Sequence, residues 1–577
     1  MRSIGAGALG LDQVGNGVTL AGWVDRRRDH GGVTFIDLRD HSGIVQVVFD
    51  PESIPDVTEL RMEYCISVSG SVRPRPPGTE NPDLATGAVE VAAGSLEILS
   101  TSEALPFMID DRTEVEELTR LEYRYLDLRR PRMAANLKAR SRVVAAIRQT
   151  FDRAGFLEVE TPALVRSTPE GARDMLVPSR LQIGSFYALP QSPQLFKQLL
   201  MVSGVDRYFQ IARCYRDEDF RSDRQLEFTQ LDMEGAFWAE DDVQGAIEEC
   251  LVAAVAAVRG VEPPRPFRRM TWHQAMDRYG SDKPDLRFGM EIMDLSEVFS
   301  GTGFRAFANA LEAGGHVRGI NAGPGDLSRA KADTLTEIAK RAGGRGLVWL
   351  VTEQDGSIRS PISKFLTEDE AAALISAMAA VPGDRLLLVA DSWKVAVEAL
   401  GALRLELGRP QGHQDLEFLW VTDFPMFEPS AGGITFLHHP FTAPQDVMVM
   451  EERPLEALAR AYDVVVNGVE LGSGSIRIHD PNIQERVFEI LGISKAEAES
   501  RFGWFLRALR FGPPPHGGFA FGIDRLVMVL QEENSIREVI AFPKTQSGSD
   551  PMTESPSVVD PAQLAELGIK LSTPRQE

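Results

Sequence analysis

The sequence predicts an α+β protein built from several domains. Three observations lead to this prediction: the chain has 577 residues, five short apolar strands follow one another near its N-terminus, and a middle region alternates helices and strands. A single hydrophobic core rarely organises more than about 250 residues, so a chain of this length divides into domains. We expect an N-terminal domain at 1–105, a hinge at 106–130, a central domain in two parts at 131–286 and 409–545, an insertion at 287–408 and an extension at 546–577.

The N-terminal domain is predicted from its strand pattern. Five runs of apolar or alternating residues lie between 18 and 100: VTLAGWVD, VTFIDLRD, IVQVVF, CISVSGSV and VEVAAGSLEIL. Five short strands in so few residues predict a small closed barrel, for which the OB-fold is a common form. Phe35 lies on one of these strands, where an aromatic side chain either fills the core or stacks against a nucleic-acid base.

The central domain and the insertion differ in periodicity. Apolar residues recur at a helical period from 131 to 156, and 155–164 is then a strand that Pro162 stops. The insertion alternates helices with strands, which indicates an α/β domain with its own core. Its predicted elements lie at 331–342, 347–352, 368–380 and 385–390, and one further helix is predicted near 561–567 in the extension.

Composition and charge limit the possible functions. The net charge of −23 argues against a protein that coats nucleic acid, although a local basic stripe suffices for a contact. Two such stripes, at 26–28 and 121–142, are either solvated faces or RNA contacts. No apolar run reaches the ~18 residues of a membrane helix, and the N-terminus lacks the pattern of a secretory signal. The three cysteines are widely spaced, so we expect neither a disulfide framework nor a cysteine zinc site, and a cytoplasmic setting.

Two segments carry the residues that point to chemistry. The first, FQIARCYRDEDFRSDRQLEFTQLDMEGAF (209–237), is predicted as two strands joined by an arginine-rich loop. Guanidinium groups can bind phosphate through paired hydrogen bonds, although such a loop can equally be a surface hairpin with ion pairs. The second, GGFAFGIDRLVMVL (517–530), places Arg525 at the start of an apolar helix, a position that favours anions. Taken alone, it is equally a glycine-rich turn capped by Asp524.

These two segments and the strand that ends at Pro162 resemble, in order and spacing, the three signature motifs of class II aminoacyl-tRNA synthetases. Six segments are similar to bacterial-type aspartyl-tRNA synthetases: STPEGARD (167–174), QSPQLFKQLLM (191–201), RDEDFRSDRQLEFTQLD (216–232), LHHPFTAP (437–444), NGVELGSGSIRI (467–478) and FGIDR (521–525). The similarity extends over essentially the whole chain. It implies an OB-fold anticodon-binding barrel, an antiparallel catalytic sheet flanked by helices, a GAD-type insertion and a homodimer.

The resemblance implies a two-step reaction. The carboxylate of aspartate attacks the α-phosphorus of ATP and pyrophosphate leaves; a terminal hydroxyl of tRNA then accepts the aspartyl group. Such catalysis is mostly positioning and charge neutralisation. It also implies Mg²⁺ with ATP, and neither zinc nor an organic prosthetic group. The implied Mg²⁺ ligands are Asp463 and Glu470, which taken alone are simply two strand-end carboxylates. The implied nucleotide-binding residues are Arg216, Asp217, Glu218, Gln225, Glu470, Gly522, Ile523, Asp524 and Arg525.

The implied amino-acid site is rich in charged residues. Its members are Glu170, Ser192, Gln194, Lys197, Asp232, His438 and Arg477. We expect Lys197, Arg477 and His438 to form a cationic cradle that distinguishes aspartate from asparagine. Asparagine would leave these cations unpaired, at a cost of about 3–5 kcal/mol. Glu170 is expected on a loop that closes over the substrate. His438 and His439 have no third ligand at a suitable spacing, so we reject a metal site there.

The resemblance implies that the barrel selects the tRNA. Phe35 would stack against an anticodon base, and Gln46 and Glu90 would contact base edges. His30 and Gly78 resemble residues of the non-discriminating subtype, which aspartylates tRNA(Asn) as well as tRNA(Asp) and so supplies an amidotransferase. The alternative is a strictly tRNA(Asp)-specific enzyme, in which His30 caps a loop and Gly78 serves a turn.

Three other functions are weighed against this interpretation. A synthetase for asparagine or lysine would not suit two cations at Lys197 and Arg477. A non-catalytic RNA-binding relative predicts the loss of Arg216, Glu470 or Arg525, and all three are present. A tRNA-independent ligase of the asparagine synthetase type would lack the N-terminal barrel.

Overall fold

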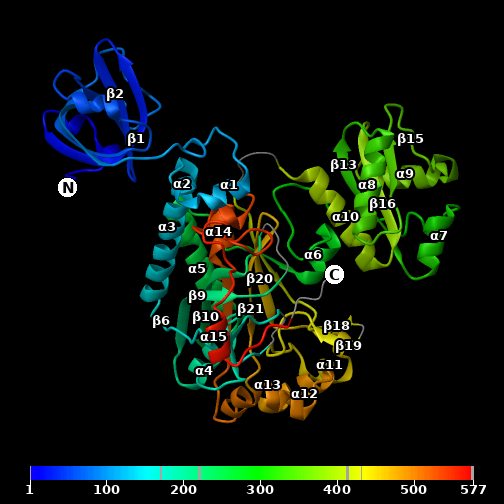
Figure 1. Ribbon diagram of the computed structural model, residues 1–577. Helices are drawn as coiled ribbons and strands as arrows, with labels where there is room; N and C mark the ends of the chain where they lie inside the picture. Colours follow the sequence, from blue (N-terminus) through cyan, green and yellow to red (C-terminus); the bar gives the residue numbers. More distant parts are fainter. Residues whose placement is uncertain (1, 169–171, 219–222, 411–414, 431, 573–577) are drawn as a thin grey trace. The chain divides into compact units, whose positions relative to one another are not determined.

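The chain forms two compact units, which are described separately. The structure is a computed structural model and describes residues 2–168, 172–218, 223–410, 415–430 and 432–572. The first unit holds the chain up to Leu137 with the short stretches Ala541–Thr545 and Ser549–Ser557, and the second unit holds the rest (Figure 1). Within the described ranges, no helix has the length and apolar character needed to cross a membrane.

A closed five-stranded barrel forms most of the first unit, as the strand pattern predicts. Its strands follow the order β1-β2-β3-β5-β4. Their bounds are β1 (Gly17–His30), β2 (Val33–Asp40), β3 (Gly43–Phe49), β4 (Cys65–Pro74) and β5 (Val89–Ser100). Leu20, Ile36 and Val91 are among the side chains that fill its interior. Strand β1 extends beyond the predicted segment because its basic residues continue the ladder with β2, where Arg28 pairs with Phe35 after a bulge.

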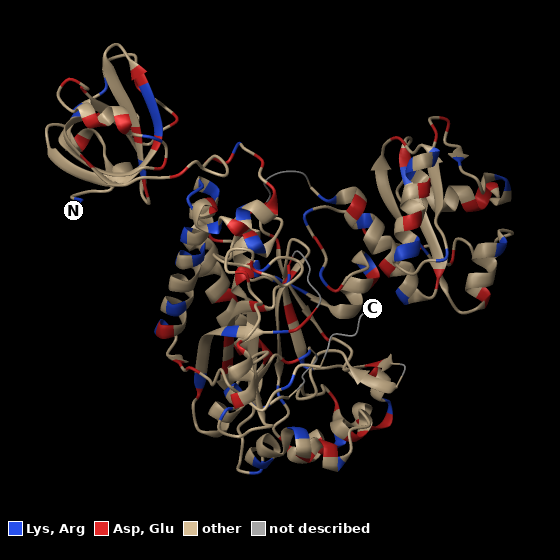
Figure 2. Ribbon diagram, in the orientation of Figure 1, with Lys and Arg blue, Asp and Glu red and all other residues tan. Residues whose placement is uncertain are grey.

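The basic stripe at 121–142 is only partly internal, because Arg124 and Arg130 are buried whereas Arg132, Lys138 and Arg142 are exposed. Helices α1 (Glu117–Glu122) and α2 (Arg124–Asp127) lead into α3 (Pro131–Arg153), and Figure 2 shows the basic residues along them. Arg120 Nε and Arg124 Nη1 lie 2.9 and 2.6 Å from the carboxylate of buried Asp127. Arg129 lies over the Trp23 ring and pairs with Glu63 at 2.7 Å. These arginines therefore hold the first unit together, which favours a structural role for this part of the stripe.

An eight-stranded sheet forms the centre of the second unit, in the order β11-β17-β20-β21-β22-β10-β9-β6. Its six central strands are antiparallel, and only the edge pairs β11–β17 and β6–β9 are parallel. The bounds are β6 (Leu157–Glu158), β9 (Arg207–Tyr215), β10 (Glu227–Ala236), β11 (Arg268–Thr271), β17 (Phe418–Thr422), β20 (Ala461–Val466), β21 (Val469–Ile476) and β22 (His516–Gly522). Helices α3, α5 (Glu240–Arg259) and α14 (Ile523–Leu530) share one apolar core with this sheet, through residues such as Ile147, Leu251, Trp420 and Val527.

The strand predicted at 155–164 is much shorter in the structure. Gly155 has a φ of +75° and follows the end of α3, and only Leu157–Glu158 pairs as β6, at the edge of the sheet. The remaining helices and short strands of this unit are β7 (Leu176–Pro178), β8 (Phe186–Ala188), α4 (Gln194–Val202), α6 (Trp272–Tyr279), β18 (Phe427–Ser430), β19 (Gly433–Phe436), α11 (Val447–Glu452), α12 (Pro481–Ile490), α13 (Lys495–Ala508) and α15 (Pro561–Glu566).

The inserted region has a sheet of its own, in the order β12-β13-β16-β14-β15. Every strand pair in this sheet is antiparallel, unlike the parallel sheets that alternating helices and strands usually form. Its elements are β12 (Met293–Asp294), α7 (Arg305–Glu312), β13 (His316–Pro324), α8 (Arg329–Arg341), β14 (Val348–Thr352), β15 (Ile358–Arg359), α9 (Glu368–Ala377), β16 (Asp384–Asp391) and α10 (Trp393–Gly408). The predicted helices and strands all lie within a few residues of these bounds.

Candidate functional site

A large pocket of the second unit lies over the face of the central sheet. Its volume is about 990 Å³, and residues of α4, β10, β21, β22 and α14 line it. Sequence segments that lie about 290 residues apart meet here because β10 pairs directly with β22, as in the pair Asp232–Ala520. Most of the candidate residues therefore surround one cavity. Those that line it are Ser192, Gln194, Lys197, Arg216, Glu218, Gln225, Asp232, His438, Glu470, Arg477, Gly522, Asp524 and Arg525.

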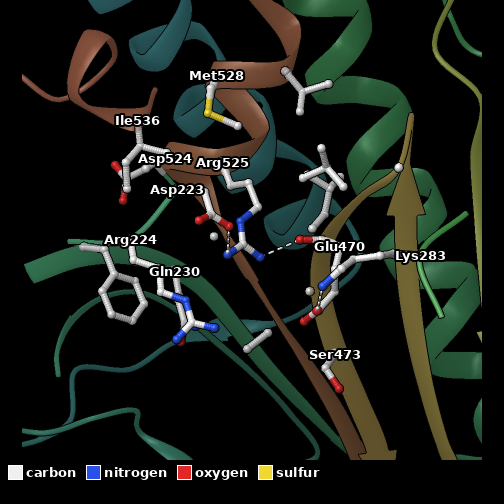
Figure 3. A pocket seen from close by; sticks show the side chains of 18 of the residues that line it. Asp223, Arg224, Gln230, Lys283, Glu470, Ser473, Asp524, Arg525, Met528 and Ile536 are labelled. Carbon is white, nitrogen blue, oxygen red and sulfur yellow. Dashed lines mark hydrogen bonds and ion pairs between the residues drawn. The ribbon is translucent and has the colours of Figure 1, made fainter. Parts of the chain in front are cut away.

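One end of the pocket is formed by partly exposed cations. Arg216 follows β9, and its guanidinium lies 5.1 Å from the centre of the Phe228 ring. Arg525 lies in the first turn of α14, and its Nη1 donates to the carbonyl oxygen of Glu470 at 2.5 Å (Figure 3). Its Nη2 lies 3.2 Å from the carboxylate of Asp223. The two guanidinium groups thus face one cavity, an arrangement that suits a phosphate chain.

The hairpin residues at this end differ in their placement. Glu218 accepts a hydrogen bond from Arg224 Nη1 at 2.8 Å, and Gln225 is buried beside the pocket. Asp217 instead pairs with Arg173 at 3.5 Å, and it is absent from the pocket lining that the described residues form. The hairpin tip at 219–222 lies outside the described residues.

The start of α14 lines the pocket and is also fixed by contacts of Asp524 with neighbouring elements. Asp524 is buried, accepts a hydrogen bond from the Thr229 amide at 2.8 Å and pairs with Arg140. The side chain of Ile523 lies in the apolar core, so this predicted nucleotide-binding residue could offer a ligand only its backbone. Asp524 anchors the helix that carries Arg525, because its bonds tie α14 to β10 and α3.

Asp463 and Glu470 form a pair of neighbouring carboxylates on β20 and β21. Asp463 is buried, and its Oδ1 has no hydrogen-bond partner among the residues that the structure describes. Burial, and then the charge of Glu470, hold the pKa of Asp463 well above its usual range. A cation beside the two carboxylates would offset both the burial of the Asp463 charge and its repulsion by Glu470, so the residues present fit a divalent ion. No group of three or more His, Cys, Asp or Glu side chains suited to a metal occurs in the described part of the chain.

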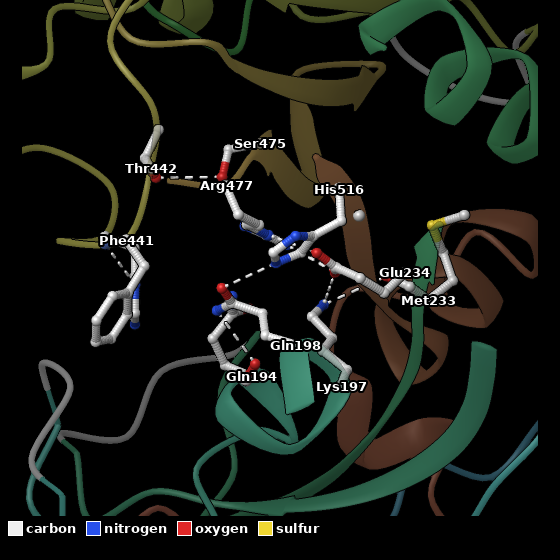
Figure 4. Close-up of polar contacts among 12 residues, drawn as sticks. Gln194, Lys197, Gln198, Met233, Glu234, Phe441, Thr442, Ser475, Arg477 and His516 are labelled. Atoms are coloured by element: carbon white, nitrogen blue, oxygen red, sulfur yellow. Dashed lines mark hydrogen bonds and ion pairs between the residues drawn. The ribbon is translucent and has the colours of Figure 1, made fainter. Parts of the chain in front are cut away.

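At the other end of the pocket lies a buried network of four charged side chains, which we call the charge cluster: Lys197, Asp232, Glu234 and Arg477. Figure 4 shows Lys197, Glu234 and Arg477 of this cluster. Lys197 Nζ lies 2.9 Å from Asp232 Oδ2 and 3.3 Å from Glu234 Oε2. Arg477 donates from Nε and Nη2 to the two oxygens of Glu234, at 2.9 and 3.2 Å. The cluster contains two cations and two carboxylates, so both cations already have partners.

This finding corrects the expected cationic cradle. Asparagine would not leave Lys197 and Arg477 unpaired, because Glu234 accepts from both. Burial alone would raise the pKa of Glu234, but Arg477 and Lys197 outweigh it and hold this pKa below its usual value. Burial raises the pKa of Asp232 despite the neighbouring Lys197.

Glu234 is not among the predicted site residues, although the sequence contains a weak signal for it. Asp232 and Glu234 alternate with the core residues Leu231 and Met233 on β10, so both acids face the pocket side of the sheet. Gly518 lies opposite Glu234 in the ladder, and a Cβ there would lie only 1.8 Å from Glu234 Oε2. The glycine at this position therefore leaves room for the carboxylate.

Two buried polar atoms beside the charge cluster lack partners. Gln194 Nε2, at the start of α4, and Asp232 Oδ1 have no hydrogen-bond partner within the described ranges. Buried unpaired groups of this kind are rare in proteins and point to a ligand or water. Ser192 also lines the pocket, whereas Glu170 lies outside the described residues.

His438 differs from the cationic role expected for it. Burial, and then the neighbouring His439, lower the pKa of His438 to about 4, so its ring is neutral at pH 7. Its Nδ1 lies 3.4 Å from Ser473 Oγ, and its ring packs edge-on against Phe424. A neutral imidazole can donate one hydrogen bond to a ligand, but it adds no positive charge to the cluster.

The residues expected to contact an anticodon gather on one face of the barrel. Gln46 Nε2 donates to Glu90 Oε2 at 2.8 Å, and Arg28 Nη2 donates to Gln46 Oε1 at 3.3 Å. Phe35 is half-buried and is the ladder partner of Arg28. His30, at the end of β1, and Gly78, with a φ of +86°, are both exposed on the barrel. The arrangement offers an aromatic face beside polar groups, which suits a single-stranded base.

Known proteins resemble this chain over nearly its whole length. The family model "tRNA synthetases class II (D, K and N)" matches residues 116–546, and the model "OB-fold nucleic acid binding domain" matches 18–99. The "Aspartate--tRNA(Asp/Asn) ligase" of Moorella thermoacetica is 53% identical, over 100% of this chain and 97% of that protein. The protein of the same name from Thermobifida fusca is 52% identical, over 99% of this chain and 98% of the relative.

Solved structures support the fold. The asparaginyl-tRNA synthetase of Pyrococcus horikoshii, complexed with asparaginyl-adenylate, matches with a TM-score of 0.58 and 19% identity, and covers 92% of this chain and 96% of its own. At this identity the likeness concerns the architecture alone. The matches of sequence over the barrel and the central sheet, together with this architecture, show that the chain belongs to the class II aminoacyl-tRNA synthetases of the D, K and N group.

Proposed function

We propose that the chain activates L-aspartate with ATP and transfers it to tRNA(Asp) and tRNA(Asn). The observation that carries this proposal is the agreement between whole-chain relatives and one pocket. Relatives at 50–53% identity bear the name "Aspartate--tRNA(Asp/Asn) ligase". In this chain Lys197, Asp232 and Arg477 of the charge cluster line the same cavity as the cations Arg216 and Arg525. This arrangement suits a small acidic substrate held beside a nucleotide.

The nucleotide would bind at the end that carries Arg216 and Arg525. Attack by the aspartate carboxylate on the α-phosphorus of ATP forms the new P–O bond and breaks the bond to pyrophosphate. Arg216 would neutralise charge that grows on the α-phosphate, and Arg525 would hold the far phosphates at a helix start. Glu218 and Gln225 would contact the nucleotide from the hairpin. Asp463 and Glu470 would hold Mg²⁺, which neutralises phosphate charge when bound.

The substrate carboxylate would bind beside Lys197 and Arg477, and the substrate ammonium beside Asp232 Oδ1. Selection against asparagine then rests on hydrogen-bond direction as well as charge. Lysine and arginine side chains only donate, so an asparagine amide nitrogen placed there would meet donors and remain unsatisfied. Ser192, Gln194 and Glu170 would complete the site around the substrate, and neutral His438 would donate to it.

In the second step a terminal tRNA hydroxyl attacks the aspartyl carbonyl and AMP leaves. We propose that Phe35, Gln46 and Glu90 contact the anticodon, and that His30 and Gly78 permit tRNA(Asn). A tRNA-dependent amidotransferase would then convert the mischarged product. The alternative, a strictly tRNA(Asp)-specific enzyme, keeps every part of the first step.

We also propose that the protein acts in the cytoplasm as a homodimer. The hairpin β7–β8 exposes Leu176, Leu181, Ile183 and Phe186, with exposed fractions of 57, 83, 68 and 48%. Clustered exposed apolar side chains are typical of association surfaces, and twofold dimers are the commonest oligomers.

ATP–pyrophosphate exchange with and without L-aspartate tests the first step. We expect exchange that depends on L-aspartate and is not supported by L-asparagine or L-lysine. Charging of purified tRNA(Asp) and tRNA(Asn) then tests the second step. A tRNA(Asn) rate thousands of times below the tRNA(Asp) rate would favour the strictly specific alternative.

A further inference from the structure

The segment of residues 280–289, which we call the linker segment, borders the pocket without any role assigned so far. It joins α6 to the inserted region, and its residues Lys283, Asp285 and Arg287 line the cavity. Arg287 forms a bidentate ion pair with Asp285, with Nε and Nη2 at 2.9 and 2.6 Å from the two carboxylate oxygens. Lys283 instead approaches Glu470, with Nζ 4.0 Å from Oε2 (Figure 3). Lys283 therefore adds a positive charge at the end of the pocket that holds Arg525.

Helix α10 of the inserted region holds the linker segment along its length. At one end, Gly280 packs so closely on α10 that a Cβ would lie 2.0 Å from the Val397 carbonyl oxygen. At the other end, buried Arg404 donates to the carbonyl oxygens of Asp285, Phe288 and Gly289, at 2.7, 2.7 and 3.1 Å. The first of these bonds satisfies the carbonyl group of buried Asp285, which would otherwise lack a donor.

Aromatic packing strengthens this attachment. The guanidinium of Arg404 lies 4.0 Å from the centre of the Phe288 ring and 4.9 Å from that of Tyr279. A Cβ at Gly408 would lie 2.2 Å from the Phe288 ring, so α10 and the segment are in direct contact. On the opposite side, the β20–β21 turn approaches Asp285, because a Cβ at Gly468 would lie 3.1 Å from its Cβ. The segment is thus held between α10 and the two strands that carry Asp463 and Glu470.

We propose that Lys283 binds the pyrophosphate end of ATP and that Arg404 is a positioning residue that holds Lys283 there. The inference rests on the proposed function, since it assumes that ATP occupies this pocket. Half of the Lys283 side chain is exposed and its ion pair with Glu470 is long, so it can turn to a more highly charged partner. Under this proposal the inserted region takes part in nucleotide binding, because Arg404 lies on α10, which belongs to that region.

Steady-state ATP–pyrophosphate exchange tests the role of Lys283. We expect Lys283→Met to raise the KM for ATP and for pyrophosphate about tenfold, the typical worth of a charged hydrogen bond, and to leave the KM for L-aspartate unchanged. Lys283→Arg should recover most of the loss. Calorimetric titration should show ATP binding weakened by a similar factor and AMP binding unaffected. An unchanged KM for ATP, or an equal loss for AMP, would overturn the assignment.

A double-variant comparison tests Arg404. If Arg404 acts through Lys283, Arg404→Met should raise the KM for ATP, and the variant that carries both changes should be no worse than Lys283→Met alone. Gly408→Ala displaces Phe288 from the other direction and should raise the same KM, which covers the case that Arg404→Met does not fold. Arg385→Met is the matched control, because Arg385 also donates to backbone carbonyl oxygens, at 2.7 and 3.2 Å, but within the inserted sheet; its KM for ATP should stay unchanged.

The outcomes separate this inference from the proposed function. Wild-type protein without aspartate-dependent exchange would overturn the proposed function. If the wild type shows exchange and Lys283→Met has an unchanged KM for ATP, only the role of Lys283 is overturned. If the losses add in the double variant, the positioning role of Arg404 is overturned.

Discussion

The two ends of the pocket handle charge in opposite ways. In the charge cluster, Lys197 and Glu234 are about 1% and 0% exposed, and each charged group has a partner of the opposite sign. At the nucleotide end, Lys283 and Glu470 are 50% and 39% exposed in their side chains, and they lie 4.0 Å apart. The charges at one end are buried and paired with one another, whereas those at the other end are partly exposed to solvent.

This difference fits what each end would bind. Aspartate and asparagine are nearly equal in size, so their discrimination needs donors held rigidly in a site that excludes water. A triphosphate carries several charges, and the reaction must release pyrophosphate. Solvent-exposed cations are therefore sufficient to bind the triphosphate and to release pyrophosphate. The buried end should therefore respond strongly to loss of a single charge, and the exposed end should lose function with little loss of stability.

The largest expected effect is on stability at the buried end. Glu234→Gln leaves Lys197 and Arg477 with only Asp232 as an anionic partner, and breaking a buried ion pair typically costs about 3–5 kcal/mol. We expect a clear fall in the thermal unfolding temperature of the second unit, measured by calorimetry. Glu227→Gln on the same strand is the control: its partner Arg213 lies 2.5 Å away, in a half-exposed pair, so the change should cost less than about 1 kcal/mol. Equal losses for both variants would contradict the comparison.

The second prediction concerns rate at the exposed end. Arg216→Lys keeps the positive charge but removes the fork that binds two phosphate oxygens. We expect the kcat of aspartate-dependent exchange to fall about 10²–10³-fold, the usual cost of losing one donor to transition-state charge, while the unfolding temperature stays close to that of the wild type. Arg213→Lys, on the adjoining strand, is absent from the pocket lining formed by described residues and should keep its kcat. A stability loss in Arg216→Lys as large as that of Glu234→Gln would remove the distinction between the two ends.

The sequence predicts the barrel and the nucleotide end more fully than the charge cluster, for a physical reason. Barrel strands alternate between core and solvent, and Arg216 and Arg525 stand out as cations beside apolar strands and glycines. Glu234 lies on a strand buried on both faces, where its partners Lys197 and Arg477 come from segments 37 and 243 residues away. Its importance is visible only once β10 and β22 are known to pair.

Other differences have similar causes. The strand predicted at 155–164 has enough β-forming residues, but only Leu157–Glu158 joins the ladder with β9, at the edge of the sheet, and the Val159 amide adds one further bond to Phe209. Lys283 resembles an ordinary surface lysine in sequence, and its significance comes from Glu470, which approaches it from a distant strand. Long-range pairing decides both cases, and no local pattern encodes it.

The third prediction uses pH to examine the buried end. The pKa of His438 is about 4 in the folded protein and near 6.5 in the unfolded chain, so below pH 6.5 the unfolded chain binds the extra proton. The stability that neutral His438 contributes is therefore lost as pH falls, by about 2 kcal/mol between pH 7 and 5.

Urea unfolding of wild type and His438→Gln at pH 7 and 5 measures this loss. The raised pKa of Asp463 acts in the opposite direction, since its stabilising effect is lost as pH rises, but both proteins contain it and it cancels in the comparison. We expect the wild type to lose about 2 kcal/mol more than the variant on acidification. An identical pH dependence in the two proteins would show that His438 is accessible to protons in the folded state.

The smallest effect is expected at the barrel of the first unit. If the pocket alone selects the amino acid, a change at His30 should alter only the choice of tRNA. We expect His30→Leu to lower kcat/KM for tRNA(Asn) relative to tRNA(Asp) about tenfold, equivalent to about 1.4 kcal/mol. Aspartate-dependent exchange, which needs no tRNA, should be unchanged and serves as the internal control. Gly78 has a φ of +86°, so Gly78→Ala would strain the turn as well, and His30 is the cleaner position. A parallel fall for both tRNAs would mean that the barrel lost affinity without losing selectivity, and tRNA choice would then have to be sought elsewhere on the chain.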